Sequence, residues 1–265
     1  MNKMLQQERH DLIIKQLQEY QSVKITELSK RLDVTRETIR KDLYELEEKG
    51  LIRKVHGGAV LSKPNFETKY SSRKDANELE KKAIAKKAAS LVSDNDTIYI
   101  DYGTTALYFA RELILTKNDL NIITNSLSLA NELVENSDFN IIVIGGNIRK
   151  NEKSMYGPTA YRTIADLYVD MGFFGIGALH PEVGYTNIHM GEAEVSRLMI
   201  QHSQKAIMMV DYSKFGTIHM NKVASIEDVH TLITDQNADE RMINVIKSKN
   251  TNVIVVEVEG SEDDE

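Results

Sequence analysis

The chain has 265 residues, of which 41% are hydrophobic, and a formal net charge of −7. This length can hold one small domain and a second of ordinary size, and the absence of cysteine excludes disulfides and thiolate metal sites. No signal peptide or membrane-spanning run is evident, so we expect a cytoplasmic protein.

Residues 1–60 predict a winged helix-turn-helix domain. Apolar residues at helical spacing predict three helices, and a basic strand, a tight turn at Gly57-Gly58 and a second strand follow them. Thr35 is placed to cap the third helix, whereas Lys24 stands where a capping residue is expected for the second. The expected buried faces are Ile13, Leu17 and Tyr20; Ile25, Leu28 and Leu32; and Ile39, Leu43 and Leu46.

The start of the third helix and the wing are the expected DNA contacts. Residues 1–60 hold 12 Lys and Arg against 10 Asp and Glu, so the net charge is +2 there and −9 in the remainder. Local basic charge of this kind attracts phosphates, and a module that binds protein is the less favoured alternative. The candidate DNA-binding residues are Thr35, Arg36, Glu37, Thr38, Arg40, Lys41, Arg53, Lys54 and His56.

The rest of the chain predicts a linker and a larger α/β domain. Residues 61–77 are polar and lack sustained periodicity, which is typical of a linker. From residue 78 to 259, helix-like segments alternate with short apolar runs, which predicts a mainly parallel sheet covered on both faces. Residues 260–265 form an acidic tail.

Small and polar residues follow several of these predicted strands. Ligands of parallel sheets bind at the carboxyl ends of the strands, and a glycine before a helix start favours an anion there. Together with Lys214 as a counter-charge, the loops predict a site for a phosphorylated sugar. Its candidate residues are Asp101, Gly103, Thr104, Thr105, Asn125, Ser126, Gly145, Gly146 and Lys214.

Several motifs resemble the DeoR family of bacterial sugar-metabolism regulators. These motifs are Thr38-Ile39-Arg40-Lys41-Asp42-Leu43, Arg53-Lys54-Val55-His56-Gly57-Gly58-Ala59, Asp101-Tyr102-Gly103-Thr104-Thr105, Ile123-Thr124-Asn125-Ser126-Leu127, Ile144-Gly145-Gly146 and Asp211-Tyr212-Ser213-Lys214-Phe215. The resemblance covers nearly the whole chain. It implies a repressor, commonly oligomeric, whose affinity for operator DNA changes when a phosphorylated sugar binds.

The second domain also resembles ribose-5-phosphate isomerases, so a sugar-phosphate isomerase is the alternative function. In this resemblance Asp170 matches the first acid and Glu194 matches the glutamate base, which adds both residues to the effector site. The place of the second acid falls at Phe173, and the lysine-glycine loop is missing. Because isomerisation needs groups that stabilise an enediolate, we expect binding without turnover, with no cofactor and no metal.

Overall fold

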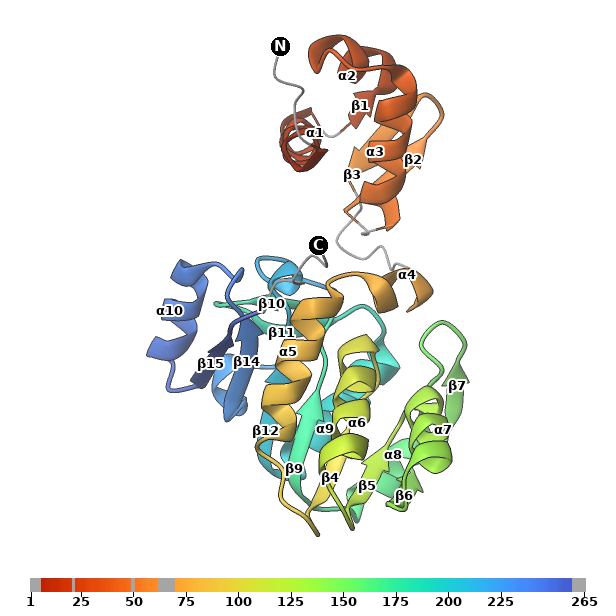
Figure 1. Ribbon diagram of the computed structural model, residues 1–265. Helices are drawn as coiled ribbons and strands as arrows, with labels where there is room; N and C mark the ends of the chain where they lie inside the picture. Colours follow the sequence, from red (N-terminus) through yellow and green to blue (C-terminus); the bar gives the residue numbers. More distant parts are fainter. Residues whose placement is uncertain (1–5, 21, 49–50, 62–69, 259–265) are drawn as a thin grey trace, which may run out of the picture. The chain divides into compact units, whose positions relative to one another are not determined.

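The computed structural model describes residues 6–20, 22–48, 51–61 and 70–258 (Figure 1). The chain divides into two compact units, Met1–Ala76 and Asn77–Glu265. Residues 62–69 of the predicted linker and the predicted acidic tail lie outside the described residues, but the linker segment contains a short helix, α4 (Tyr70–Asp75). Among the helices that the structure describes, none is long and apolar enough to cross a membrane.

The first unit has the predicted helices and a small antiparallel sheet. Its sheet has the strand order β1-β3-β2. The predicted apolar faces are buried together, from Ile13 on the first helix to Leu46 on the third, but Tyr20 is 58% exposed and its predicted burial is wrong. The elements are α1 (Gln6–Tyr20), β1 (Ser22–Lys24), α2 (Ile25–Arg31), α3 (Arg36–Glu48), β2 (Ile52–Val55) and β3 (Gly58–Leu61).

The local signals at the helix starts act as predicted. The Thr35 hydroxyl accepts a hydrogen bond from the backbone N–H of Thr38 at 3.1 Å, so it caps α3. Lys24 precedes α2 without a side-chain cap.

The turn of the wing lies one residue earlier than predicted. His56 and Gly57 form the turn, with Gly57 at a φ of +79°, and Gly58 is the first residue of β3. Gly58 is required for another reason, because a Cβ there would lie 1.9 Å from the carbonyl oxygen of Val23 on the paired strand β1.

The second unit contains the predicted parallel sheet. Its seven strands are all parallel, in the order β15-β14-β12-β9-β4-β5-β6. They are β4 (Thr97–Ile100), β5 (Asn121–Thr124), β6 (Asn140–Val143), β9 (Val169–Phe174), β12 (Ser203–Met209), β14 (Thr231–Asp235) and β15 (Asn252–Val256). The helices are α5 (Glu78–Ala89), α6 (Thr104–Thr116), α7 (Leu127–Asn136), α8 (Pro158–Ala165), α9 (Met190–Gln201) and α10 (Glu240–Ser248).

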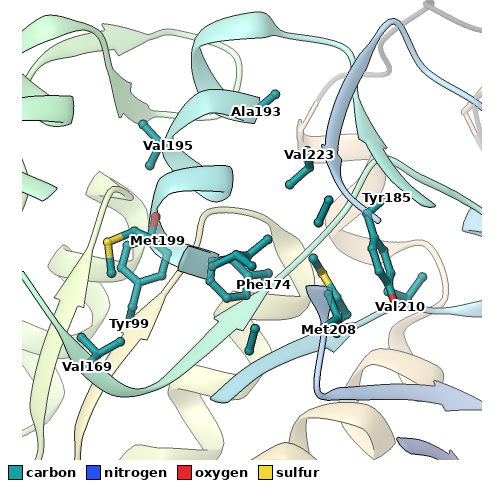
Figure 2. Packing of buried hydrophobic residues seen from close by; sticks show 14 of the residues in the cluster. Tyr99, Val169, Phe174, Tyr185, Ala193, Val195, Met199, Met208, Val210 and Val223 are labelled. Carbon is teal, nitrogen blue, oxygen red and sulfur yellow. The ribbon is translucent and has the colours of Figure 1, made fainter. Parts of the chain in front are cut away.

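Successive strand residues enter two separate apolar cores, as the pleat of a strand requires. Ile98 and Ile100 pack with α5, α6 and α7 on one face of the sheet. Tyr99 packs on the other face with α8 and α9, where its ring lies 5.5 Å from that of Phe174 (Figure 2). The two-sided burial explains why the strands read as uninterrupted apolar runs.

Two small sheets were not predicted from the sequence. The hairpin of β7 (Asn147–Arg149) and β8 (Ser154–Tyr156) follows β6, and β10 (Ala178–His180), β11 (Gly184–Asn187) and β13 (Asn221–Ala224) form an antiparallel sheet. Their strands have only three or four residues, too few to show a clear periodicity.

We predict that Gly58→Ala destabilises the first unit by about 3 kcal/mol, because its methyl group would overlap the backbone of β1. The matched variant Gly57→Asn should cost less than about 1 kcal/mol, since asparagine tolerates a positive φ and no atom lies within 4 Å of a Cβ at this position. Urea unfolding with hydrogen exchange of the β1 and β3 amides measures both. Equal losses would contradict this role of Gly58.

Candidate DNA-binding surface and effector site

The start of α3 presents the predicted polar side chains to solvent. Arg36, Glu37, Arg40 and Lys41 are exposed, whereas Thr38 is half-buried. Arg40 Nη1 lies 2.8 Å from Glu37 Oε2, so these two side chains pair in the free protein. The pair is exposed and contributes little to stability, so a phosphate or base edge can replace Glu37 at small cost.

The wing residues differ in their freedom to reach DNA. Arg53 and His56 are exposed. Lys54 is exposed as well, but its side chain lies against the far end of α3, where its Nζ is 3.2 Å from Glu47 and 4.6 Å from the centre of the Tyr44 ring. Arg53 and His56 are therefore the better placed wing contacts.

A buried ion pair, which was not predicted from the sequence, joins α1 to α3. Arg9 donates two hydrogen bonds of 2.8 and 2.9 Å to Asp42, whose carboxylate is almost fully buried. The hydrogen bonds to Asp42 raise the pKa of Arg9. His10 is buried beside the same carboxylate, with Nε2 3.4 Å from its Oδ1. Asp42 therefore orients α3, rather than contacting DNA.

In the second unit, the carboxylate of Asp101 joins several loops at the carboxyl edge of the sheet. Asp101 directly follows β4, is completely buried, and accepts four hydrogen bonds. The donors are Tyr99 Oη at 3.1 Å, the Tyr102 N–H at 2.9 Å, Asn125 Nδ2 at 2.9 Å and Ser196 Oγ at 2.6 Å. Burial raises the pKa of Asp101 to about 7, while these hydrogen bonds oppose the shift.

The segment after Asp101 forms an open helix start. Gly103 precedes α6 with a φ of +122°, and no atom lies within 4 Å of a Cβ at this position. Thr104 and Thr105 follow in the first turn. The first N–H groups of a helix have no partner within the helix and carry partial positive charge, so this position suits an anion.

Several buried side-chain atoms have no hydrogen-bond partner among the groups that the structure describes, and two of them concern the proposed site. They are Asn125 Oδ1, on the residue that donates to Asp101, and Asn187 Nδ2. Asn187 accepts a hydrogen bond from the N–H of Gly177, in the loop that follows β9. Since unpaired buried polar atoms are costly, both atoms are suited to a ligand with hydroxyl groups.

Lys214 lies at the same edge, in the short 3₁₀ helix Tyr212–Lys214 that follows β12. Burial alone would raise the pKa of Asp211, but Lys214, the Ser213 hydrogen bonds and Lys81 together lower it. Asp211 follows β12, which is separated from β4 by β9, so these strands lie about 10 Å apart. Lys214 can therefore supply positive charge to an anion at the start of α6 from a neighbouring part of the same edge.

The structure corrects one predicted effector contact and gives a second one a partner within its own helix. Asp170 lies at the amino end of β9, where it is exposed and accepts a hydrogen bond from the N–H of Thr97, so it stands at the opposite edge of the sheet. Glu194 is half-buried and pairs with Arg197. Glu194 lies two positions after Glu192, so the helix turns its side chain about 200° away from the face that Glu192 and Ser196 share.

Glu192 is a functional candidate that the predicted effector residues do not include. Its carboxylate is completely buried and accepts hydrogen bonds from Arg149 Nη1 and Ser154 Oγ. Glu192 therefore connects the β7–β8 hairpin to the start of α9. Ser196, which donates a hydrogen bond to Asp101, lies one helical turn later. The spacing of these two residues by four positions was the available signal.

The remaining predicted residues have local structural roles. Ser126 caps α7 by accepting a hydrogen bond from Leu129. Gly145 and Gly146 have positive φ angles, and a Cβ at Gly146 would lie 2.5 Å from the carbonyl oxygen of Tyr156, so this pair allows the chain to turn into the hairpin.

Comparisons with known proteins match both units of the chain to known domains. Residues 9–65 match the DeoR-like helix-turn-helix domain, and residues 76–236 match the DeoR C terminal sensor domain. The chain is 35% identical to the HTH-type transcriptional regulator GolR of Listeria innocua, over 89% of this chain and 92% of that protein. It is 34% identical to the glycerol-3-phosphate regulon repressor of Escherichia coli, over 88% and 92%.

Among solved structures, ribose 5-phosphate isomerase A from Neisseria gonorrhoeae is similar over 53% of this chain and 54% of that one, with 18% identity and a TM-score of 0.38. The family models and the long matches to regulators show which family the chain belongs to. The chain belongs to the DeoR family, and it is a helix-turn-helix transcriptional repressor of sugar-metabolism operons rather than an enzyme, as predicted.

We predict that Asp101 makes the second unit less stable as the pH rises from 6 to 8. A folded-state pKa near 7, above the ordinary value near 4, favours the protonated form, so its contribution is full at low pH and is lost through pH 7. The expected loss is about 1 kcal/mol across this interval.

Urea unfolding of the wild type and of Asp101→Asn at both pH values measures this effect. The variant is expected to be less stable overall but to lose the pH-dependent part. The exposed residue Asp138 provides the control, because Asp138→Asn should retain the wild-type pH dependence. A pH dependence that survives in Asp101→Asn would contradict the assignment to Asp101.

Proposed function

We propose that the protein binds operator DNA as a homo-oligomer and is released when a phosphorylated sugar binds at the carboxyl edge of the parallel sheet. The observation that supports this most is the open start of α6 beside the buried, unpaired Asn125 oxygen. The first is suited to a phosphate and the second to a sugar hydroxyl.

The proposed effector site has two regions, one that binds the phosphate and one that binds the sugar. The phosphate is held by Gly103, Thr104 and Thr105, and Lys214 supplies positive charge from the end of β12. Asn125 and Asn187 offer one acceptor and one donor to the sugar. A charged phosphate in a partly enclosed site needs both donors and a cation, which this set contains.

The main role of Asp101 in this site is to position other side chains. Its carboxylate already accepts four hydrogen bonds, so it has little capacity left for a sugar hydroxyl. By holding Asn125 through its amide nitrogen, it leaves the amide oxygen of Asn125 for the ligand. This assignment replaces the direct contact predicted from the sequence.

The effector must bind the DNA-competent and the DNA-incompetent states with different affinity, because equal affinity would not change the population. Arg149 and Ser154 connect the β7–β8 hairpin to α9 through Glu192. A ligand that moves Asn125 or Ser196 would also affect this connection, since the carbonyl of Asn125 accepts a hydrogen bond from the N–H of Met155 in β8 and Ser196 Oγ donates to the carbonyl of Glu192.

We predict that Arg40→Ala weakens operator binding by about 1–3 kcal/mol if the guanidinium contacts a base. Lys205→Ala removes an exposed positive charge from the second unit and should leave operator binding unchanged. Gel-shift titrations at one salt concentration, with operator and scrambled DNA, measure both variants. The DNA surface is assigned wrongly if a triple alanine variant at Arg36, Arg40 and Lys41 keeps full operator affinity.

We predict that Thr104→Val and Lys214→Ala still bind the operator but no longer respond to the sugar phosphate. The first removes a hydroxyl donor at the helix start and the second removes the proposed counter-charge. Thr163→Val makes the same change in α8, where the hydroxyl bonds within its own helix, and should respond normally.

Calorimetry with phosphorylated sugars and their unphosphorylated forms gives the direct measurement. We expect the wild type to bind one phosphorylated sugar, without converting it, and to bind the unphosphorylated form much more weakly. Equal affinity for the two forms would show that the start of α6 does not bind a phosphate.

A further inference from the structure

The outer strand β6 is more exposed than its place in a two-sided parallel sheet requires. It forms one edge of the sheet and packs on β5 and α7 (Figure 1). Ile142 and Val143 are 39% and 40% exposed, although parallel sheets normally bury such residues on both faces.

The backbone of β6 offers a regular set of hydrogen-bonding groups at this edge. The N–H groups of Asn140 and Ile144 bond to β5, at 3.0 Å to Leu120 and 3.1 Å to Thr124. Because successive residues of a strand direct these groups to opposite sides, Ile141 and Val143 direct their N–H and C=O groups to the open edge.

The edge also lacks charged residues, proline and bulges, which are among the features that prevent strands from pairing. From Phe139 to Ile144 the sequence contains no charged residue and no proline, and the β5–β6 register has no bulge. Natural edge strands usually carry such features, because an unprotected edge is a template for another strand.

We propose that two copies of the chain join by pairing their β6 strands antiparallel, about a two-fold axis at Ile142. Ile141 of one copy then exchanges both backbone hydrogen bonds with Val143 of the second copy, and the reverse. Ile142 lies opposite Ile142 of the second copy in a non-hydrogen-bonded pair, with Cα atoms about 4.5 Å apart. The exposed Ile142 side chains are thereby buried against each other.

A second copy fits this edge better than an unrelated partner does. The outward groups of Ile141 and Val143 lie symmetrically around Ile142, so the strand is complementary to itself, as a two-fold interface requires. The proposed operator binding gives a reason for the pairing, on which this inference rests, since helix-turn-helix proteins read two half-sites as dimers.

The opposite edge of the sheet is a weaker candidate. β15 is also apolar, and Val255 is 42% exposed. However, its central residue, Ile254, already packs against the core, so pairing about that residue would bury little new apolar surface. Val255 therefore provides a matched control for Ile142.

The test is the mass of the full chain in solution, measured by analytical ultracentrifugation without DNA or sugar. The wild type and Val255→Lys should have the same mass, a dimer or a multiple of it. In Ile142→Lys two lysines would face each other, so self-association should weaken by a factor on the order of ten or more.

Val143→Pro is the second variant, because it removes an N–H that points to the open edge and leaves the bonds to β5 intact. It should reduce the mass as Ile142→Lys does, with unchanged circular dichroism. The proposal is overturned by a monomeric wild type, by wild-type mass in both β6 variants, or by dissociation in Val255→Lys alone.

Gel shifts distinguish this failure from failure of the proposed function. A wild-type monomer that binds the operator would overturn the β6 interface and leave the repressor function in place. A dimer that dissociates in both β6 variants, but whose wild type does not bind the operator, would support the interface and contradict the proposed function.

Discussion

The arrangement of the sensor unit depends on one buried carboxylate. Asp101 collects hydrogen bonds from its own strand, from the following loop, from the end of β5 and from α9. A buried carboxylate without donors would be strongly unfavourable, so these four groups must stay where they are. The position of Asn125, and with it the geometry of the proposed effector site, follows from this requirement.

The same principle holds in the DNA-binding unit, with a smaller network. Asp42 lies on the buried face of α3 and pairs with Arg9 of α1. This buried contact fixes the rotation of α3 and thereby determines which residues are on its exposed face. Removal of one residue of such a buried ion pair leaves the charge of the other uncompensated. The exposed residues at the start of α3 are thus presented by a rigid support, which an interface with DNA needs.

Much of the fold could be predicted because local patterns suffice for it. The spacing of Ile39, Leu43 and Leu46 defines the buried face of α3, and Thr35 marks its start. The apolar runs between helices predicted a parallel sheet buried on both faces. The hairpin of β7 and β8 was missed because its strands are too short to carry a pattern.

The sequence by itself determined the two units, the buried faces and the loops that carry polar residues, because these follow from periodicity and residue type. Only the tertiary structure decided which polar residues meet. Asp170 was expected at the site, but β9 continues to Phe174, so Asp170 starts the strand at the far edge. Glu192 and Ser196 face Asp101's side of α9, and Glu194 does not. Contacts between such residues depend on the order of the strands and on the rotation of the helices about their axes, which no local sequence pattern specifies.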